Sequence, residues 1–165
     1  MNDAYYELLV ARKHRSLDVL IKAVTIAAIV VLILIIPLFG ILAMFAAAIL
    51  GVAAYFLIFP KLDIEYEYSL VNHDLEIDVI YCKRKRKQLI TLDLRQAEII
   101  APASSHRLDS YQRLKRIDYS AGDTSQTPYA MVIPKQQEMV CILIQLDDVM
   151  ENRLRGILPR IFFVD

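Results

Sequence analysis

The stretch AVTIAAIVVLILIIPLFGILAMFAAAILGVAAYFLIF, from Ala23 to Phe59, decides the architecture of this chain of 165 residues. It runs for roughly 37 residues without a charged side chain. A single helix of that length would measure about 55 Å, nearly twice the hydrocarbon core of a bilayer, because each helical residue rises about 1.5 Å. Pro37 and Gly40 interrupt the run near its middle. The stretch therefore predicts two membrane-spanning helices joined by a tight turn.

The two predicted helices, at about 17–38 and 41–60, form a hairpin in the cell membrane. Lysine and arginine flank the hairpin at its outer ends, whereas its turn contains neither. The positive-inside rule then places both termini in the cytoplasm. A re-entrant hairpin that enters the lipid without crossing it leaves the termini on the same side and stays open as an alternative. The run contains no Asp, Glu, Lys, Arg or His, which favours a plain anchor over a transport path.

Residues 1–16 form a predicted segment of their own before the first apolar helix. Apolar residues recur at helical spacing from Ala4 to Ala11, ahead of a basic cluster of Arg12, Lys13 and Arg15. This pattern predicts a helix in the membrane interface, with the three cations against anionic lipid headgroups. The alternative is a short leader held near the surface by the topology alone.

Residues 61–165 predict a cytoplasmic β-rich domain. From Asp63 apolar and polar residues alternate, and after the turn Asn72–Asp74 the alternation resumes, which predicts an antiparallel hairpin. Further strands are predicted at 88–94, 97–101, 114–120, 129–134 and 139–146. Asp148 and Glu151 then resemble a capping box at the start of a terminal helix. The predicted fold class is an α+β membrane protein: a transmembrane helical hairpin followed by a PH-like antiparallel β split barrel of about seven strands, capped by a C-terminal helix.

Several short stretches carry a resemblance to a known family. They are Tyr66–Tyr68, Asn72–Asp74, Leu75–Asp78, Lys83–Lys87 and Ile99–Pro102, together with Arg12–Lys13 and His106–Tyr111. These stretches resemble a bacterial family of small uncharacterised membrane proteins, in which two membrane helices precede a PH-like domain. The resemblance covers most of the chain and implies the fold but no activity, because the family is a domain of unknown function. Bacterial PH-like domains more broadly suggest surfaces that bind lipid, peptide or further copies of themselves, which is an analogy of fold.

The densest group of charges is a run of five consecutive cations between the second and third predicted strands: Lys83, Arg84, Lys85, Arg86 and Lys87. Near an anionic leaflet each such cation contributes about 1 kcal/mol, so the run predicts contact with lipid headgroups. Two alternatives stay open, namely a solvated turn and a turn whose cations pair with acids of the same chain. Nucleic acid is not expected as a partner, because the run has no interleaved aromatic residues and the domain is not strongly basic.

Four acids of the first predicted hairpin point outward from one face: Glu65, Glu67, Glu76 and Asp78. Like charges so close together repel, which predicts a cation beside them. The candidates are the run at 83–87, the basic cluster before the membrane, or a protein that uses the four acids as its binding surface.

No residue set predicts catalysis, a cofactor or a metal site. Ser104, Ser105, His106 and Asp109 are residue types of hydrolases, but no nucleophile elbow or oxyanion-hole glycine accompanies them. The three histidines are dispersed, without the spacing of metal ligands. The sequence therefore predicts a non-enzymatic, membrane-tethered module that contacts lipid headgroups or a membrane-bound protein, or a second copy of itself. The alternative is a structural subunit of a larger membrane complex.

Overall fold

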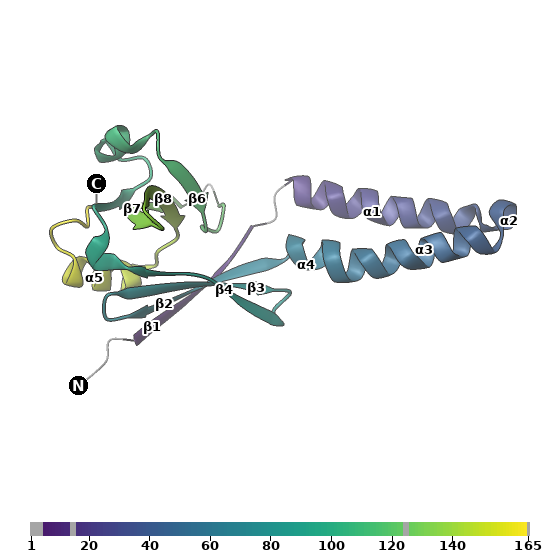
Figure 1. Ribbon diagram of the computed structural model, residues 1–165, viewed down its shortest axis with the longest axis horizontal. Coiled ribbons are helices and arrows are strands. Elements are labelled where there is room, and N and C mark those ends of the chain that lie inside the picture. Colours follow the sequence, from purple (N-terminus) through teal and green to yellow (C-terminus); the bar gives the residue numbers. More distant parts are fainter. Residues whose placement is uncertain (1–4, 14–15, 124–125, 165) are drawn as a thin grey trace. The chain divides into compact units, whose positions relative to one another are not determined.

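The computed structural model describes residues 5–13, 16–123 and 126–164 of the chain. The chain divides into two compact units, whose parts can be followed in Figure 1. We call His14–Ile64 with Tyr81–Lys85 the helical unit, and Met1–Lys13, Glu65–Ile80 and Arg86–Asp165 the sheet unit. Residues 5–13, predicted as a segment of their own, therefore group with the sheets.

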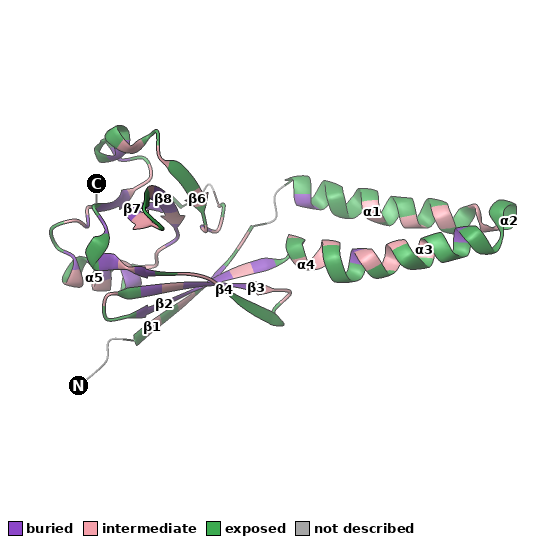
Figure 2. Cartoon of the chain, viewed as in Figure 1, coloured by how far each residue is buried: buried purple, intermediate pink, exposed green. Residues whose placement is uncertain are grey.

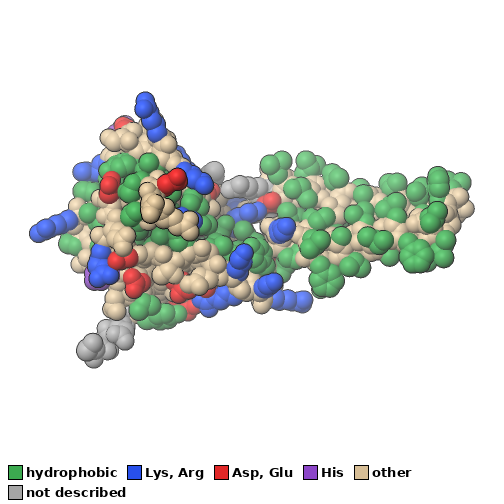
Figure 3. All heavy atoms as spheres, viewed as in Figure 1, with side chains coloured by type: hydrophobic (Ala, Val, Ile, Leu, Met, Phe, Trp, Pro, Cys, Tyr) green, Lys and Arg blue, Asp and Glu red, His purple; other side chains and the backbone are tan. Residues whose placement is uncertain are grey.

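The helical unit is a hairpin of two long helices. The first is α1 (Ser16–Leu34), and the second is continuous from Ile41 to Leu62 through α3 (Ile41–Ala53), the π-helical turn η1 (Ala54–Ile58) and α4 (Phe59–Leu62). The helices α1 and α3 lie side by side (Figure 1). Both long helices are apolar and long enough to cross a membrane, and only 11% of each is buried inside the protein (Figure 2). Their visible surface is lined with hydrophobic side chains (Figure 3).

The turn of the hairpin lies where Pro37 and Gly40 predict it. A short helix, α2 (Ile36–Phe39), carries Pro37 in its first turn, where the missing N–H breaks no helical hydrogen bond. Gly40 has φ +60° and ψ −139°, a backbone conformation that essentially only glycine adopts. The chain then enters α3 directly. These two residues therefore supply the reversal that the length of the apolar run demands.

A second proline explains the π-helical turn. Within η1 the hydrogen bonding widens, and the N–H of Phe59 bonds to the carbonyl of Ala54, five residues earlier. Pro60 follows immediately; it has no N–H to donate, and in a regular helix its ring would clash with the carbonyl four residues before it. A wider turn is one way in which a helix accommodates such a residue. The second long helix thus continues past Pro60 to Leu62.

The sheet unit contains two four-stranded sheets (Figure 1). The first has the order β1-β2-β3-β4, with bounds Tyr5–Ala11, Ile64–Val71, Asp74–Tyr81 and Lys85–Asp93. The second has the order β5-β7-β8-β6, with bounds Ile99–Pro102, Tyr129–Lys135, Glu138–Ile144 and Lys115–Asp118. All seven strands predicted after Pro60 are present. One prediction is wrong: β6 pairs parallel, not antiparallel, with β8, because the chain after β6 crosses over to β7 before it reaches β8.

The described part of the N-terminal segment is a strand, not the predicted interfacial helix. β1 pairs antiparallel with β2, from Tyr5 opposite Val71 to Ala11 opposite Glu65. The burial of its side chains alternates along the strand, and Val10 is buried. An isolated helix of about ten residues is marginal in water, whereas a strand at this position gains a complete ladder of hydrogen bonds. Pairing with a distant strand thus overrides the local helical spacing.

Tyr68 joins the two sheets at the core of the sheet unit. Its side chain is fully buried, and its hydroxyl donates to the carbonyl of Tyr119 at 2.6 Å and accepts from the N–H of Gln145 at 3.3 Å. Fully buried apolar side chains come from both sheets and from the terminal helix, among them Leu70, Leu75, Ile77, Ile100, Met131, Ile142, Met150 and Leu154. Two short 3-10 helices, η2 (Leu94–Gln96) and η3 (His106–Tyr111), connect the outer strands.

The terminal helix α5 (Asp148–Ile157) packs on this core through Met150 and Leu154. Its cap differs from the prediction by one residue. Asp147, not Asp148, is the N-cap, and its Oδ1 accepts the N–H of Met150 at 2.8 Å. The pair Asp148 and Glu151 is therefore not a capping box; both acids lie in the first turn, where negative charge is favourable.

Candidate functional site

The basic run lies at the β3–β4 hairpin, as predicted: Lys83 and Arg84 are in the turn, Lys85–Lys87 begin β4, and all five cations are exposed. The N–H of Arg84 donates to the carbonyl of Tyr81 at 3.0 Å and closes the turn. Cys82 and Lys83 between them have φ of 47° and 55°. Two successive residues in the left-handed region are the signature of a type I′ hairpin turn, which fits the twist of the flanking strands. The tight turn presents its charged side chains to solvent.

The first half of the run, Lys83–Lys85, belongs to the helical unit. The N–H of Cys82 donates to the carbonyl of Asp63 at 2.9 Å, directly after the last residue of α4. A cavity of about 380 Å³ lies at the same place and is lined by residues of α1, of α4 and of this turn: Asp18, Val19, Lys22, Phe59, Leu62, Asp63 and Cys82. The turn is therefore fixed to the open end of the hairpin, where α1 begins and α4 ends.

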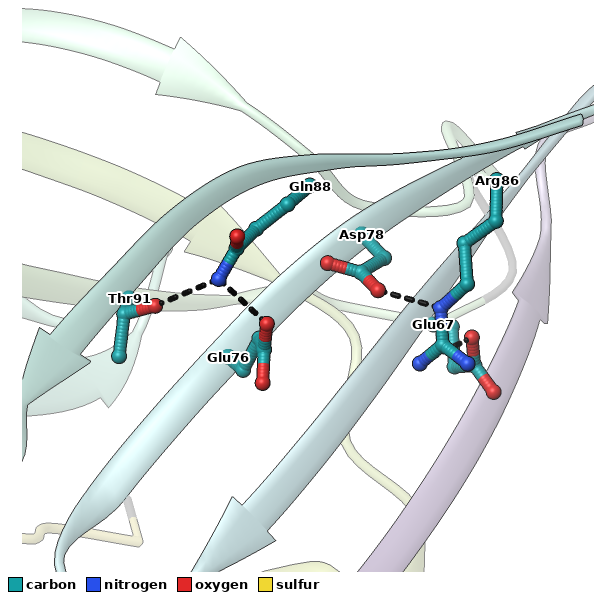
Figure 4. Close-up of polar contacts among 6 residues, drawn as sticks. All are labelled: Glu67, Glu76, Asp78, Arg86, Gln88 and Thr91. Carbon is teal, nitrogen blue, oxygen red and sulfur yellow. Dashed lines mark hydrogen bonds and ion pairs between the residues drawn. The ribbon is translucent and has the colours of Figure 1, made fainter.

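The second half of the run behaves differently, because Arg86 turns toward the acids of the first sheet (Figure 4). Its Nη2 lies 2.8 Å from Oε2 of Glu67, and its Nε donates to Oδ2 of Asp78. The side chain of Arg86 is 51% exposed, whereas those of Glu67 and Asp78 are 10% and 7% exposed. The hypothesis that the run pairs with acids of the same chain is thus confirmed for Arg86.

A fourth residue, Glu7 of β1, completes a row across the sheet. We call Glu7, Glu67, Asp78 and Arg86 the charge row; each of the four strands contributes one member. Burial, helped by the hydrogen bond with Glu7, raises the pKa of Glu67 from its ordinary 4.5 to about 7, although Arg86 acts in the opposite direction. The same hydrogen bond lowers the pKa of Glu7. The hydrogen bond between the two carboxyl groups therefore uses one proton, which belongs to Glu67, while Glu7 is ionised.

The four acids predicted as a partner surface lie on β2 and β3, but they are not equally open to solvent. Glu67 and Asp78 are buried, contrary to the expected outward-facing position, because Arg86 and the neighbouring strands cover them. Glu65 and Glu76 are half-buried, and Glu76 accepts a hydrogen bond from the Gln88 amide (Figure 4). Contact of these acids with a partner protein stays a prediction.

The predicted basic cluster before the apolar run is only partly described. Lys13 forms an exposed ion pair with Asp123, with Nζ and Oδ1 2.9 Å apart. Arg12 is half-buried, and Arg15 lies outside the described residues. The lipid contact predicted for these three cations stays a prediction.

The residues of hydrolase type do not assemble into a triad. The hydroxyl of Ser105 accepts the N–H of Arg107 and caps η3, and the exposed His106 lies 3.6 Å from Asp109 across one turn. Neither contact joins a nucleophile to a base. Across the described ranges, no group of three or more His, Cys, Asp or Glu residues is arranged to hold a metal ion.

Sequence reasoning missed Glu7, because its strand was predicted as a helix. The signal was present in the sequence: Tyr6, Leu8 and Val10 alternate with Tyr5, Glu7 and Leu9 at the period of a strand, and the segment is rich in aromatic and branched side chains. It also missed a cleft beside β1, because its walls come from segments that are far apart in the chain.

Comparison with known proteins gives one result. The model of the family described as "Bacterial PH-like domain (DUF6106)" matches residues 2–164. Neither the curated proteins nor the solved structures contain a match to the chain. The family resemblance drawn from the sequence is therefore confirmed, and two apolar helices of membrane-spanning length accompany the PH-like fold. The chain belongs to this family of bacterial PH-like domains of unknown function.

Proposed function

We propose that this chain is a non-enzymatic, membrane-anchored module, in which the apolar hairpin inserts into the bilayer and the turn Lys83–Lys85 contacts anionic lipid headgroups. The observation that carries this proposal is the hydrogen bond from Cys82 to Asp63, which fixes the turn to the end of the second apolar helix within one compact unit. A hairpin that inserts would bring these three cations to the membrane surface, wherever the sheet unit lies.

Electrostatics supports headgroup contact at this turn. Each cation near an anionic leaflet is worth about 1 kcal/mol, so three together favour anionic over neutral lipid by about 3 kcal/mol, or about a hundredfold. Arg86 contributes less to this preference, because its side chain is already bonded to Glu67 and Asp78. Under the positive-inside rule, the cations that flank the hairpin support a topology with both termini on the cytoplasmic side, where the leaflet is anionic.

Lipid composition around the full chain tests this proposal. We would reconstitute the protein into vesicles of phosphatidylcholine with one fifth phosphatidylglycerol, extract it gently, and measure the retained lipids by mass spectrometry. The native chain is expected to retain phosphatidylglycerol well above its share in the vesicle. The triple variant Lys83→Gln, Arg84→Gln, Lys85→Gln should lose this enrichment.

A matched control removes three exposed cations elsewhere. Arg113, Lys115 and Arg116 lie in and before β6 of the sheet unit, and their triple replacement by Gln changes the net charge equally. That control is expected to keep the enrichment. Equal enrichment in the native chain and in the turn variant would contradict headgroup contact at the turn.

The alternative function, an assembly subunit, is favoured by small residues on α3. Ala46 and Ala48 are exposed on that helix, and small side chains permit close contact between membrane helices. Gentle extraction of the native membrane distinguishes the two functions. A stoichiometric complex with another membrane protein, together with a turn variant that keeps its lipid composition, would support the assembly role.

A further inference from the structure

A cleft of about 370 Å³ lies beside β1 in the sheet unit. Its walls come from β1, from the segment after β6 and from the entry to α5: Leu8, Leu9, Val10, Ala121, Gln126, Gln145, Leu146, Asp147 and Asp148. Side chains of successive strand residues point to opposite faces of a sheet. Leu8, Leu9 and Val10 are consecutive, so their side chains alternate between the two faces. All three can line the same cleft because it runs along the edge of the strand.

That edge is available to another strand. In the described sheet β1 is outermost, with β2 on its inner side, so the backbone groups of its outer edge have no strand beside them. Leu9, on β1, is 54% exposed. An edge strand of seven residues with exposed apolar side chains is a template for an extended peptide, which binds through backbone hydrogen bonds.

The cleft also holds a buried acceptor without a partner. Gln145 is 7% exposed, and its Nε2 donates to Oε1 of Gln126 at 3.0 Å. Its own Oε1 is buried and accepts no hydrogen bond from the residues that the structure describes. A buried acceptor left unpaired costs about 1–3 kcal/mol, so a ligand that brings an N–H group to this oxygen recovers that energy.

Charge selects the kind of donor. Among the described residues, the charged side chains that line the cleft are those of Asp147 and Asp148, with no lysine or arginine. Asp147 is already engaged, since its two oxygens accept from the Met150 N–H and the Tyr6 hydroxyl. Asp148 lies in the first turn of α5 and is exposed. A cationic N–H donor complements this lining better than a neutral or acidic one.

We propose that this cleft binds an extended, basic segment of a partner protein, which adds a strand along the outer edge of β1 and places a lysine or arginine side chain between Gln145 Oε1 and Asp148. This interaction is independent of the lipid contact proposed for the turn Lys83–Lys85, because it uses residues of the sheet unit alone. The same module would thus bind lipid headgroups through the turn Lys83–Lys85 and a protein segment through the cleft beside β1.

Selection from random twelve-residue peptides displayed on phage tests the proposal. The full chain in nanodiscs serves as bait, and empty nanodiscs remove lipid binders. The selected peptides are expected to combine β-forming residues with at least one lysine or arginine. Their synthetic forms should bind the Asp148→Lys variant about tenfold more weakly than the native chain, because the charge at the cleft is reversed.

Two controls separate strand addition from simple attraction between charges. Glu138→Lys makes the same change of charge at the exposed β7–β8 turn and should leave the affinity unchanged. A peptide N-methylated at alternate backbone positions keeps its charge but loses the donors of the ladder, and it should bind at least tenfold more weakly. Failure to select any peptide, or equal binding by the Asp148→Lys variant or by the N-methylated peptide, would overturn the proposal.

Discussion

Arg86 of β4 bonds to acids on two other strands of the first sheet. It is the cation that contacts two buried carboxyl groups, those of Glu67 and Asp78, on one face of the sheet. Removal of one partner from a fully buried pair costs about 3–5 kcal/mol, because the remaining charge is left uncompensated. Half of the Arg86 side chain is in solvent, which screens the interaction and lowers the expected cost.

We therefore expect Arg86→Gln to lower the free energy of unfolding by about 1–3 kcal/mol. The measurement is thermal unfolding of the full chain in detergent, followed by the near-UV circular dichroism of its tyrosines. Lys87→Gln is the matched control, because Lys87 is the next residue of the same strand and is exposed. It should change stability by less than about 0.5 kcal/mol. Equal effects of the two substitutions would show that the ion pairs of Arg86 contribute nothing to the stability of the sheet.

Glu67 makes the stability of the sheet unit depend on pH. The folded protein holds the proton of Glu67 up to about pH 7, whereas the unfolded chain releases it near its ordinary pKa of 4.5. Between these two values the folded state binds more protons, so the free energy of unfolding falls as pH rises. The lowered pKa of Glu7 acts in the opposite sense and matters below pH 4.5, where its contribution is lost as pH falls.

Substitution of Glu67 by Gln tests this linkage. The amide stays neutral at every pH, can donate to Glu7 and can accept from Arg86. From pH 5 to pH 8 the native chain should lose stability more steeply than Glu67→Gln, and the two curves should converge toward low pH. Glu65→Gln, two residues away on the same strand, should follow the native curve. Parallel curves for the native chain and Glu67→Gln would contradict the proton held by Glu67.

Individual residues explain which parts of the site could be predicted. The five cations and four acids are visible in the sequence, and alternation along β2 and β3 shows that the acids share a face. Which cation reaches them is not encoded locally, because Arg86 and Lys87 have the same charge and differ only in the face to which the strand directs them. The burial of Glu67 depends on β1, a strand more than fifty residues earlier in the chain, so its raised pKa could not be foreseen.

Among the elements, the β7–β8 hairpin has a turn whose residues are poorly suited to its backbone conformation. Gln136 and Gln137 form its two-residue turn between the paired Lys135 and Glu138, and their φ values are 49° and 77°. A left-handed conformation costs a residue with a Cβ about 1–2 kcal/mol relative to the right-handed form, and Asn-Gly is the pair best suited to such a turn.

We expect the double substitution Gln136→Asn, Gln137→Gly to raise the free energy of unfolding by about 1 kcal/mol. The same thermal unfolding experiment measures it. Replacement of both residues by alanine serves as the comparison. Alanine also has a Cβ and is no better suited to the left-handed conformation than glutamine, so the alanine pair should not stabilise the protein. A double variant no more stable than the alanine pair would show that the turn is not strained.

The alternation of apolar and polar residues predicts some features of the strands but not others. The strands from β2 to β8 alternate clearly or are bounded by turn residues, and the sequence predicted all of them. For β1 a helical spacing and a strand spacing coexist over seven residues, and only the ladder with β2 decides between them. The parallel pairing of β6 with β8 depends in the same way on topology, because alternation is identical in parallel and antiparallel strands at an edge.

At the scale of the whole molecule, the structure has the two apolar helices that the length of the apolar run predicted. The structure contains two helices of 19 and 22 residues with a turn at Pro37–Gly40, and most of their surface is exposed. Exposed leucine, isoleucine, valine and phenylalanine over two helices are unfavourable in water, because each buried side chain of this kind gains about 1.5–3 kcal/mol. Insertion into a bilayer is the simplest way to remove that surface from water.

Thiol labelling in oriented membrane vesicles tests this insertion most directly. In a Cys82→Ser, Cys141→Ala background, Phe39→Cys places one reporter in the helical turn, and Gln137→Cys places another in an exposed turn of the sheet unit. A membrane-impermeant maleimide should label Phe39→Cys only in right-side-out vesicles and Gln137→Cys only in inverted vesicles. Labelling of both reporters from the same side, or of Phe39→Cys from neither side, would contradict a hairpin that crosses the membrane.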